Sequence, residues 1–120
     1  MEQVIDALRT LRVGTTIAEY DLQNKIAEAF NAKGIAYVRE YSLGSGSRVD
    51  FLADGVAVEV KKGKPNRARL VRQIEKYAAY DEVTAVVIVV ESSLFNPIKE
   101  TSIGKPCAVV GLQKLWGIAL

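Results

Sequence analysis

The chain has 120 residues, of which 49% are hydrophobic and 25% charged, and its formal net charge at pH 7 is +2. This length suits one domain with a single core, and the composition is typical of a soluble globular protein. No apolar run is long enough for a membrane-spanning helix, and the first residues do not begin a signal peptide. The chain has no histidine, which excludes histidine-dependent nucleases, zinc sites that use histidine and Ser-His-Asp triads. Its single cysteine, Cys107, excludes an internal disulfide and favours a reducing, cytoplasmic location.

Two helices are predicted in the first third of the chain. Residues 1–11 carry an apolar stripe at helical spacing, and Gly14 follows as a stop. A second helix is expected over residues 15–33, where Glu19 follows Thr16 by three residues in a capping-box pattern. Glu19 therefore has two open interpretations, as a capping side chain or as an additional metal ligand.

A strand, a loop and a hairpin are predicted next. Residues 35–41 alternate like a strand, and the Gly- and Ser-rich segment 42–47 reads as a flexible connection. Asp54-Gly55 then separates two alternating apolar runs, 48–53 and 56–61. This pattern predicts a β-hairpin with a two-residue type I′ turn, which needs positive φ at both central positions.

The two-residue turn fixes the predicted pairing of the hairpin. Asp50 lies opposite Glu59, and Val49 lies opposite Val60. The Cβ atoms of the two acids are then about 5 Å apart, with Lys61 beyond them on the same face. Like charges in this position destabilise a sheet, so a divalent metal between them is the simplest explanation. The opposite face is entirely apolar and predicts the core side of the hairpin: Val49, Phe51, Ala53, Val56, Val58 and Val60.

Two carboxylates and a lysine on one face suit hydrolysis of a phosphodiester. Mg²⁺ prefers oxygen ligands, activates water and neutralises phosphoryl charge, and a lysine beside it can stabilise the transition state. Asp50, followed after a hairpin by Glu59, Val60 and Lys61, resembles the signature of the PD-(D/E)xK nuclease superfamily, with Val49 in place of the usual proline. In the alternative interpretation the two acids are solvated strand residues paired with neighbouring cations.

A basic helix is predicted directly after the hairpin. Asn66 can cap a helix that reaches about Tyr80. Residues 61–76 contain seven cationic side chains and the single acid Glu75. This segment predicts contact with phosphate, although a solvated helix face is the alternative. The expected buried stripe of the helix is Leu70, Ile74, Tyr77 and Ala78.

Gln73 and Tyr77 lie one turn apart on this helix, and they resemble the QxxxY motif of RecB-type nucleases. The resemblance implies that Gln73 supports the active-site lysine and the substrate. Otherwise Gln73 is an exposed helix residue and Tyr77 a core residue.

Two further strands are predicted in the last third of the chain. Residues 84–90 are continuously apolar and mostly β-branched, as in a central parallel strand buried on both faces, and 107–112 read as a last strand. We therefore expect an α/β fold with a mixed central sheet flanked by helices. The order of elements resembles the restriction-endonuclease-like αβββαβ core of the nuclease superfamily over about residues 16–90, within a single domain over 1–120.

The resemblance implies a Mg²⁺- or Mn²⁺-dependent nuclease acting on DNA, with structure-dependent cutting as in Holliday-junction resolvases and with action as a homodimer or in a larger assembly. A catalytically inactive nucleic-acid-binding module and a protein-docking subunit stay open as alternatives. The implied metal ligands are Asp50, Glu59, the Val60 carbonyl and Glu19, and the implied catalytic residues are Asp50, Glu59, Lys61 and Gln73. The residues expected to contact nucleic acid are Arg48, Lys62, Lys64, Arg69, Arg72 and Tyr77.

Overall fold

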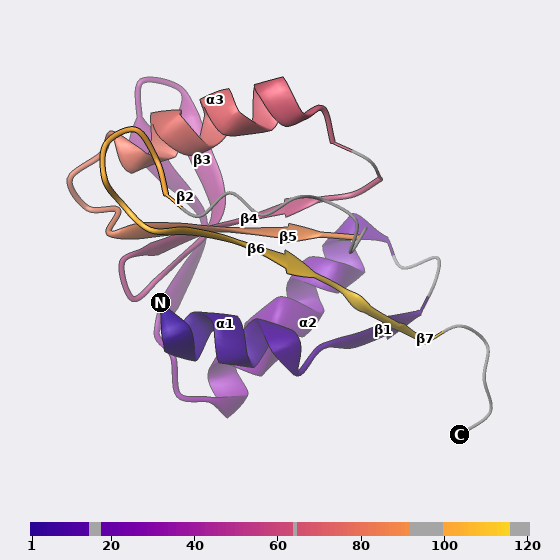
Figure 1. Cartoon of the computed structure of the whole chain (residues 1–120). Helices are drawn as coiled ribbons and strands as arrows, with labels where there is room; N and C mark the ends of the chain where they lie inside the picture. The colour runs from indigo at the N-terminus through magenta and orange to yellow at the C-terminus, as the bar shows by residue number, and fades with distance from the viewer. Residues whose placement is uncertain (15–17, 64, 92–99, 116–120) are drawn as a thin grey trace.

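The computed structural model describes residues 1–14, 18–63, 65–91 and 100–115. In these ranges the chain forms an α/β domain with three helices and a mixed five-stranded sheet of order β2-β3-β4-β5-β6 (Figure 1). A second, two-stranded parallel sheet pairs β1 with β7. The elements are α1 (Glu2–Arg9), β1 (Arg12–Gly14), α2 (Glu19–Ala32), β2 (Tyr37–Gly44), β3 (Ser47–Ala53), β4 (Val56–Lys61), α3 (Arg67–Ala78), β5 (Ala85–Val90), β6 (Cys107–Gly111) and β7 (Gln113–Leu115).

Helices cover both faces of the sheet. Figure 1 shows α1 and α2 on one face and α3 on the other, and each face has its own cluster of buried side chains. On the α2 side, Phe30 packs edge-on against Phe51 of β3, with 5.5 Å between the ring centroids. None of the helices in the described ranges is long and apolar enough to cross a membrane.

The central parallel strand predicted over 84–90 is confirmed. Strands β4 and β5 are parallel neighbours, α3 connects them along the chain, and every residue of β5 is buried. Asn66 caps α3, because its side chain accepts a hydrogen bond from the Arg69 amide at 3.0 Å. The four residues of α3 that are buried are the ones that the helical spacing predicts.

The Asp-Gly turn is confirmed, and so is the pairing next to it. Asp54 has φ 51° and Gly55 has φ 80°, as a type I′ turn requires. A Cβ on Gly55 would lie 2.9 Å from Thr84 Oγ1, so this position needs glycine for space as well as for its φ. The ladder, however, ends at the pair Phe51–Val58.

Beyond that pair the predicted register of the hairpin is wrong. Neither Asp50–Glu59 nor Val49–Val60 is a ladder pair, because β3 and β4 separate there. Val49 consequently packs in the cluster on the α3 face, whereas Phe51 packs on the α2 face. The prediction that Val49 shares a core face with Phe51 is therefore wrong as well.

The flexible loop predicted over 42–47 is also wrong, because β2 extends to Gly44 and β3 begins at Ser47. Ser45 and Gly46 have φ values of 47° and 77° and form a second tight turn between β2 and β3. Residues 41–49, called the outer hairpin below, bend toward α3 (Figure 1). The hydroxyl of Tyr80 donates to the Gly44 carbonyl at 2.9 Å and holds the outer hairpin there.

The N-terminal predictions are corrected in two places. Residues 12–14, expected to terminate a helix, form β1 and pair with β7. Helix α2 begins at Glu19 with Ala18 as its N-cap and no side-chain cap. Glu19 is therefore the first helical residue, whereas a capping box needs its glutamate at the third helical position. The predicted capping box is wrong. Thr16, the other half of that prediction, lies outside the described residues.

Candidate functional site

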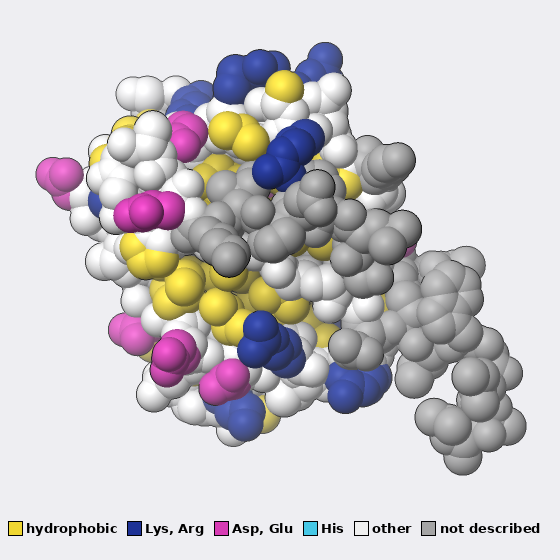
Figure 2. All heavy atoms as spheres, viewed as in Figure 1, with side chains coloured by type: hydrophobic (Ala, Val, Ile, Leu, Met, Phe, Trp, Pro, Cys, Tyr) yellow, Lys and Arg dark blue, Asp and Glu magenta, His cyan; other side chains and the backbone are white. Residues whose placement is uncertain are grey.

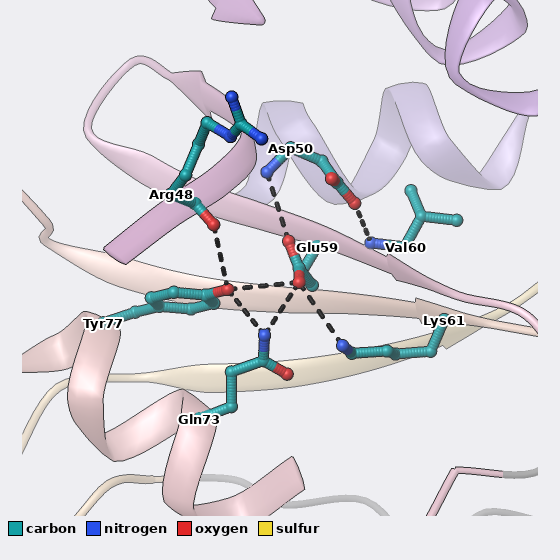
Figure 3. A network of polar contacts seen from close by, with 7 residues as sticks. All are labelled: Arg48, Asp50, Glu59, Val60, Lys61, Gln73 and Tyr77. Atoms are coloured by element: carbon teal, nitrogen blue, oxygen red, sulfur yellow. Dashed lines mark hydrogen bonds and ion pairs between the residues drawn. The ribbon is translucent and has the colours of Figure 1, made fainter. Parts of the chain in front are cut away.

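Asp50 and Glu59 meet at the fork where β3 leaves β4 (Figure 3). The Asp50 amide donates to Glu59 Oε1 at 3.1 Å, and the Val60 amide donates to Asp50 Oδ2 at 2.8 Å. The two carboxylates thus accept the backbone N–H groups that a continuing ladder would have paired. The predicted proximity of these side chains is confirmed, although through a fork and not through a regular strand pair.

The Glu59 carboxylate is surrounded by donors. The residue is only 7% exposed. Its Oε2 lies 2.9 Å from Gln73 Nε2, 3.1 Å from the Tyr77 hydroxyl and 3.4 Å from Lys61 Nζ. A buried charge is stable only when it is paired and hydrogen-bonded, and these contacts supply both conditions. The prediction that Lys61 shares a face with Glu59 is confirmed.

Gln73 and Tyr77 reach the fork from α3. Gln73 Nε2 lies 2.7 Å from the Tyr77 hydroxyl, which also lies 3.2 Å from the Arg48 carbonyl. A hydroxyl has one proton, so Tyr77 donates to either Glu59 or the Arg48 carbonyl at one time. These contacts connect α3, β3 and β4 through one side chain.

The roles predicted for these two residues need correction. Gln73 was expected to support the lysine or a phosphate, but its hydrogen bonds go to Glu59 and Tyr77. Tyr77 is only 3% exposed, so its ring is a core group and its hydroxyl an internal one. A direct contact of Tyr77 with nucleic acid is therefore contradicted.

Two groups at the fork have shifted acidities. Burial, followed by the charge of Glu59, raises the pKa of Asp50 to about 6. Burial and then the charge of Glu59 also raise the pKa of the Tyr77 hydroxyl. A carboxyl group that is costly to ionise in a partly buried place is typical of functional sites, because a bound cation would compensate the charge.

The oxygen atoms at the fork fit a divalent cation. Asp50 and Glu59 supply two hard carboxylates, and Mg²⁺ is commonly held by one or two carboxylates together with water and substrate phosphate. The Val60 amide points at Asp50, and the carbonyl of a strand residue faces the same side as its amide. The Val60 carbonyl therefore faces the fork, on the side of the two carboxylates.

Glu19 does not extend this set. It is exposed at the start of α2. Within the ranges that the structure describes, no three acidic, cysteine or histidine side chains are grouped to hold a metal. The expectation that Glu19 joins Asp50 and Glu59 is therefore not supported.

The predicted basic surface lies over α3. Figure 2 shows Lys and Arg side chains gathered at the top of the molecule, where Figure 1 places α3, and Arg69 and Arg72 are exposed there. Arg48 is exposed, and its guanidinium points away from Glu59 (Figure 3).

Two cations of the predicted nucleic-acid surface stand apart from the others. Lys62 Nζ lies 3.1 Å from Glu91 Oε1, so this lysine is paired within the protein, and its contact with phosphate stays a prediction. Lys64 lies outside the described residues. The sequence analysis missed Glu91. An acid directly after a buried parallel strand lies at the carboxyl edge of the sheet, where functional groups gather, and this position could have identified it.

The comparisons with known proteins return nothing: no family model matches the chain, and no curated protein or solved structure matches it. The function therefore has to be inferred from the geometry and chemistry of the fork itself.

Proposed function

We propose that this protein is a Mg²⁺- or Mn²⁺-dependent nuclease that hydrolyses phosphodiester bonds in DNA. One observation carries the proposal: Asp50, Glu59 and Lys61 converge at the fork between β3 and β4, where Lys61 Nζ lies 3.4 Å from Glu59 Oε2. Two acids can hold a cation that activates water, and a lysine beside them can stabilise phosphoryl charge, so this arrangement suits metal-assisted phosphodiester hydrolysis. The order α2, β2, β3, β4, α3, β5 agrees with the restriction-endonuclease-like core, which is part of the proposal.

Each residue at the fork has a separate role in this proposal. Asp50, Glu59 and the Val60 carbonyl would hold the cation. When bound, the cation would supply a more acidic water and positive charge beside the phosphoryl oxygens. Lys61 would donate to the attacking water or to the pentavalent phosphoryl group in the transition state. Gln73 and Tyr77 would position Glu59, since both contact its Oε2.

DNA binding would use the exposed arginines around the fork. Arg48, Arg69 and Arg72 are all exposed. Guanidinium groups bind phosphate oxygens and fix the register of the backbone without reading sequence. This arrangement favours recognition of DNA structure over recognition of sequence. A homodimer would provide two such sites for two strands.

A cleavage assay with matched variants tests the proposal. Linear, circular, single-stranded and branched DNA are incubated with the protein in Mg²⁺, in Mn²⁺ and in EDTA. Cleavage should require the metal and should fall by at least about a hundredfold in Asp50→Asn and Lys61→Ala, which lose groups acting in the transition state. Asp54→Asn is the control, since it removes an acid from the same hairpin while Asn-Gly keeps the type I′ turn. Equal cleavage by Asp50→Asn and Asp54→Asn would reject the site.

A second function is favoured by the Glu59 carboxylate, whose oxygens are already hydrogen-bonded and paired within the protein. Four groups of the protein itself surround its two oxygens, namely the Asp50 amide, Gln73, Tyr77 and Lys61. A network that is complete without a metal would also suit a nucleic-acid-binding module with no turnover, in which the basic α3 contributes phosphate affinity. Salt-sensitive DNA binding without cleavage in either metal would favour this module.

A further inference from the structure

A second cluster of aromatic and cationic groups lies on α2 and β2, apart from the fork. Tyr20, in the first turn of α2, is 70% exposed. The Arg39 guanidinium lies 5.7 Å from the centre of the Tyr20 ring and 5.6 Å from that of Phe51. Both distances are within the range of cation–π attraction.

The guanidinium of Arg39 is also fixed by hydrogen bonds. Its Nη1 donates to Asn24 Oδ1 at 2.8 Å, and its Nη2 lies 3.4 Å from Gln23 Oε1. Two amides and two rings therefore set the plane of this guanidinium before any ligand arrives. The Tyr20 ring lies against this oriented guanidinium, and most of its surface faces water.

This cluster is close to the fork along the strands. Arg39 is paired with Phe51 in the β2–β3 ladder, and Phe51 directly follows Asp50. The neighbouring pair between Glu40 and Asp50 is missing from the ladder, and Glu40 has φ 49°. Along β3 the cluster and the fork are therefore adjacent, because Arg39 lies opposite the residue that follows Asp50.

We propose that Tyr20 and Arg39 form a stacking site for an unpaired base of the nucleic acid that the fork cleaves. This inference rests on the proposed nuclease function and specifies its substrate class as DNA with unpaired bases: single-stranded, gapped or branched. Aromatic and guanidinium planes stack on any base, so the site would not read sequence. Paired bases within a duplex already stack on their neighbours and do not present a free face.

The charges around Tyr20 favour a base over a phosphate at this place. Glu19 and Asp21 flank Tyr20 along α2, and their carboxylates would repel a phosphate group. A nucleobase carries no formal charge and is not repelled. Two of the guanidinium nitrogens of Arg39 already contact amide oxygens, and two rings lie against the group. Arg39 therefore mainly orients Tyr20, whose exposed ring offers the stacking surface.

Binding in EDTA tests this inference separately from cleavage. The probe is a short single-stranded DNA containing 2-aminopurine, whose fluorescence falls when the base stacks, and the same strand in a duplex is the comparison. Tyr20→Ala should weaken single-strand binding about tenfold, the size expected for one stacked base, and should leave duplex binding unchanged. The salt dependence of binding should stay the same, since no phosphate contact is lost.

Two variants serve as matched controls. Tyr20→Phe keeps the ring and should bind and quench like the wild type. Arg39→Lys keeps the charge but loses the fixed plane, so it should weaken single-strand binding and leave duplex binding unchanged. Unchanged single-strand binding by Tyr20→Ala, or equal losses for both DNA forms, would overturn the inference and leave this surface for a protein partner. Fluorescence quenching without cleavage in Mg²⁺ supports the stacking site and rejects the nuclease function. Cleavage together with unchanged single-strand binding by Tyr20→Ala rejects the stacking site alone.

Discussion

The Val60 amide donates to Asp50 Oδ2 at 2.8 Å, so a carboxylate stands where the ladder between β3 and β4 would have continued. One side chain thereby ends the strand pairing and opens the fork. Burial and the charge of Glu59 raise the pKa of this same carboxyl group. The folded protein thus places at the fork a carboxylate whose ionisation is unfavourable.

Asp50→Asn should stabilise the metal-free protein at neutral pH. The folded-state pKa of Asp50, about 6, lies above the ordinary value of 3.8, so the folded state binds this proton more tightly than the unfolded state. The free energy of unfolding therefore falls as pH rises from about 4 to 6 and does not recover above that range. Asparagine stays neutral and keeps an oxygen for the Val60 amide. After allowance for partial exposure we expect a gain of about 1–2 kcal/mol at pH 7.5 and almost none at pH 4.

Urea unfolding in EDTA at these two pH values measures this gain. Asp54→Asn is the control, because it changes an acid to its amide at the exposed turn of the same hairpin. A wild type that is as stable as Asp50→Asn at pH 7.5 would mean that ionised Asp50 carries no penalty.

Mg²⁺ should raise the stability of the wild type and not that of Asp50→Asn. A ligand that binds only the folded state stabilises it by RT ln(1 + [L]/Kd), or about 1.4 kcal/mol at tenfold excess over Kd. The neutral amide is a weaker ligand for a hard cation, so the variant should lose this response. Thermal unfolding in a MgCl₂ series, compared with NaCl at matched ionic strength, provides the measurement. A similar shift in both proteins would place the metal elsewhere.

Tyr77→Phe should destabilise the protein more than Tyr80→Phe. Loss of the Tyr77 hydroxyl removes a donor to buried Glu59 and an acceptor for Gln73, and it can leave the Arg48 carbonyl unpaired. Unsatisfied buried groups of this kind cost about 1–3 kcal/mol. The Tyr80 hydroxyl bonds the Gly44 carbonyl at an exposed place, where water can replace it. Equal urea midpoints for the two variants would show that Tyr77 has no special part in holding Glu59.

The sequence predicts those parts of this fold that depend on neighbouring residues. Asp54-Gly55 specifies its turn and the first three strand pairs, because the φ requirement is local. The fork was not predictable, since alternation assumes that a ladder continues and gives no sign of a side chain replacing a backbone partner. The pairing of Arg12 with Gln113 was missed for another reason: it joins distant short segments with no periodic signal.

Tyr77 illustrates the same limit within the candidate site. Helical spacing placed it correctly in the buried stripe of α3. Its hydroxyl reaches the Arg48 carbonyl because the outer hairpin bends toward α3. This bend depends on tertiary packing and not on the spacing of residues along the helix.

Glu40→Gly should be neutral or stabilising, although glycine usually weakens a strand. Glu40 is an exposed residue with φ 49°, a conformation that costs a side-chain-bearing residue about 1–2 kcal/mol and costs glycine nothing. Ser42→Gly is the control, since Ser42 is also exposed on β2 and is not among the residues with positive φ. This second variant should lose about 0.5–1 kcal/mol through the larger backbone entropy of the unfolded chain. Urea unfolding of the two variants gives the comparison, and equal losses in both would mean that the backbone at Glu40 stores no strain beside the fork.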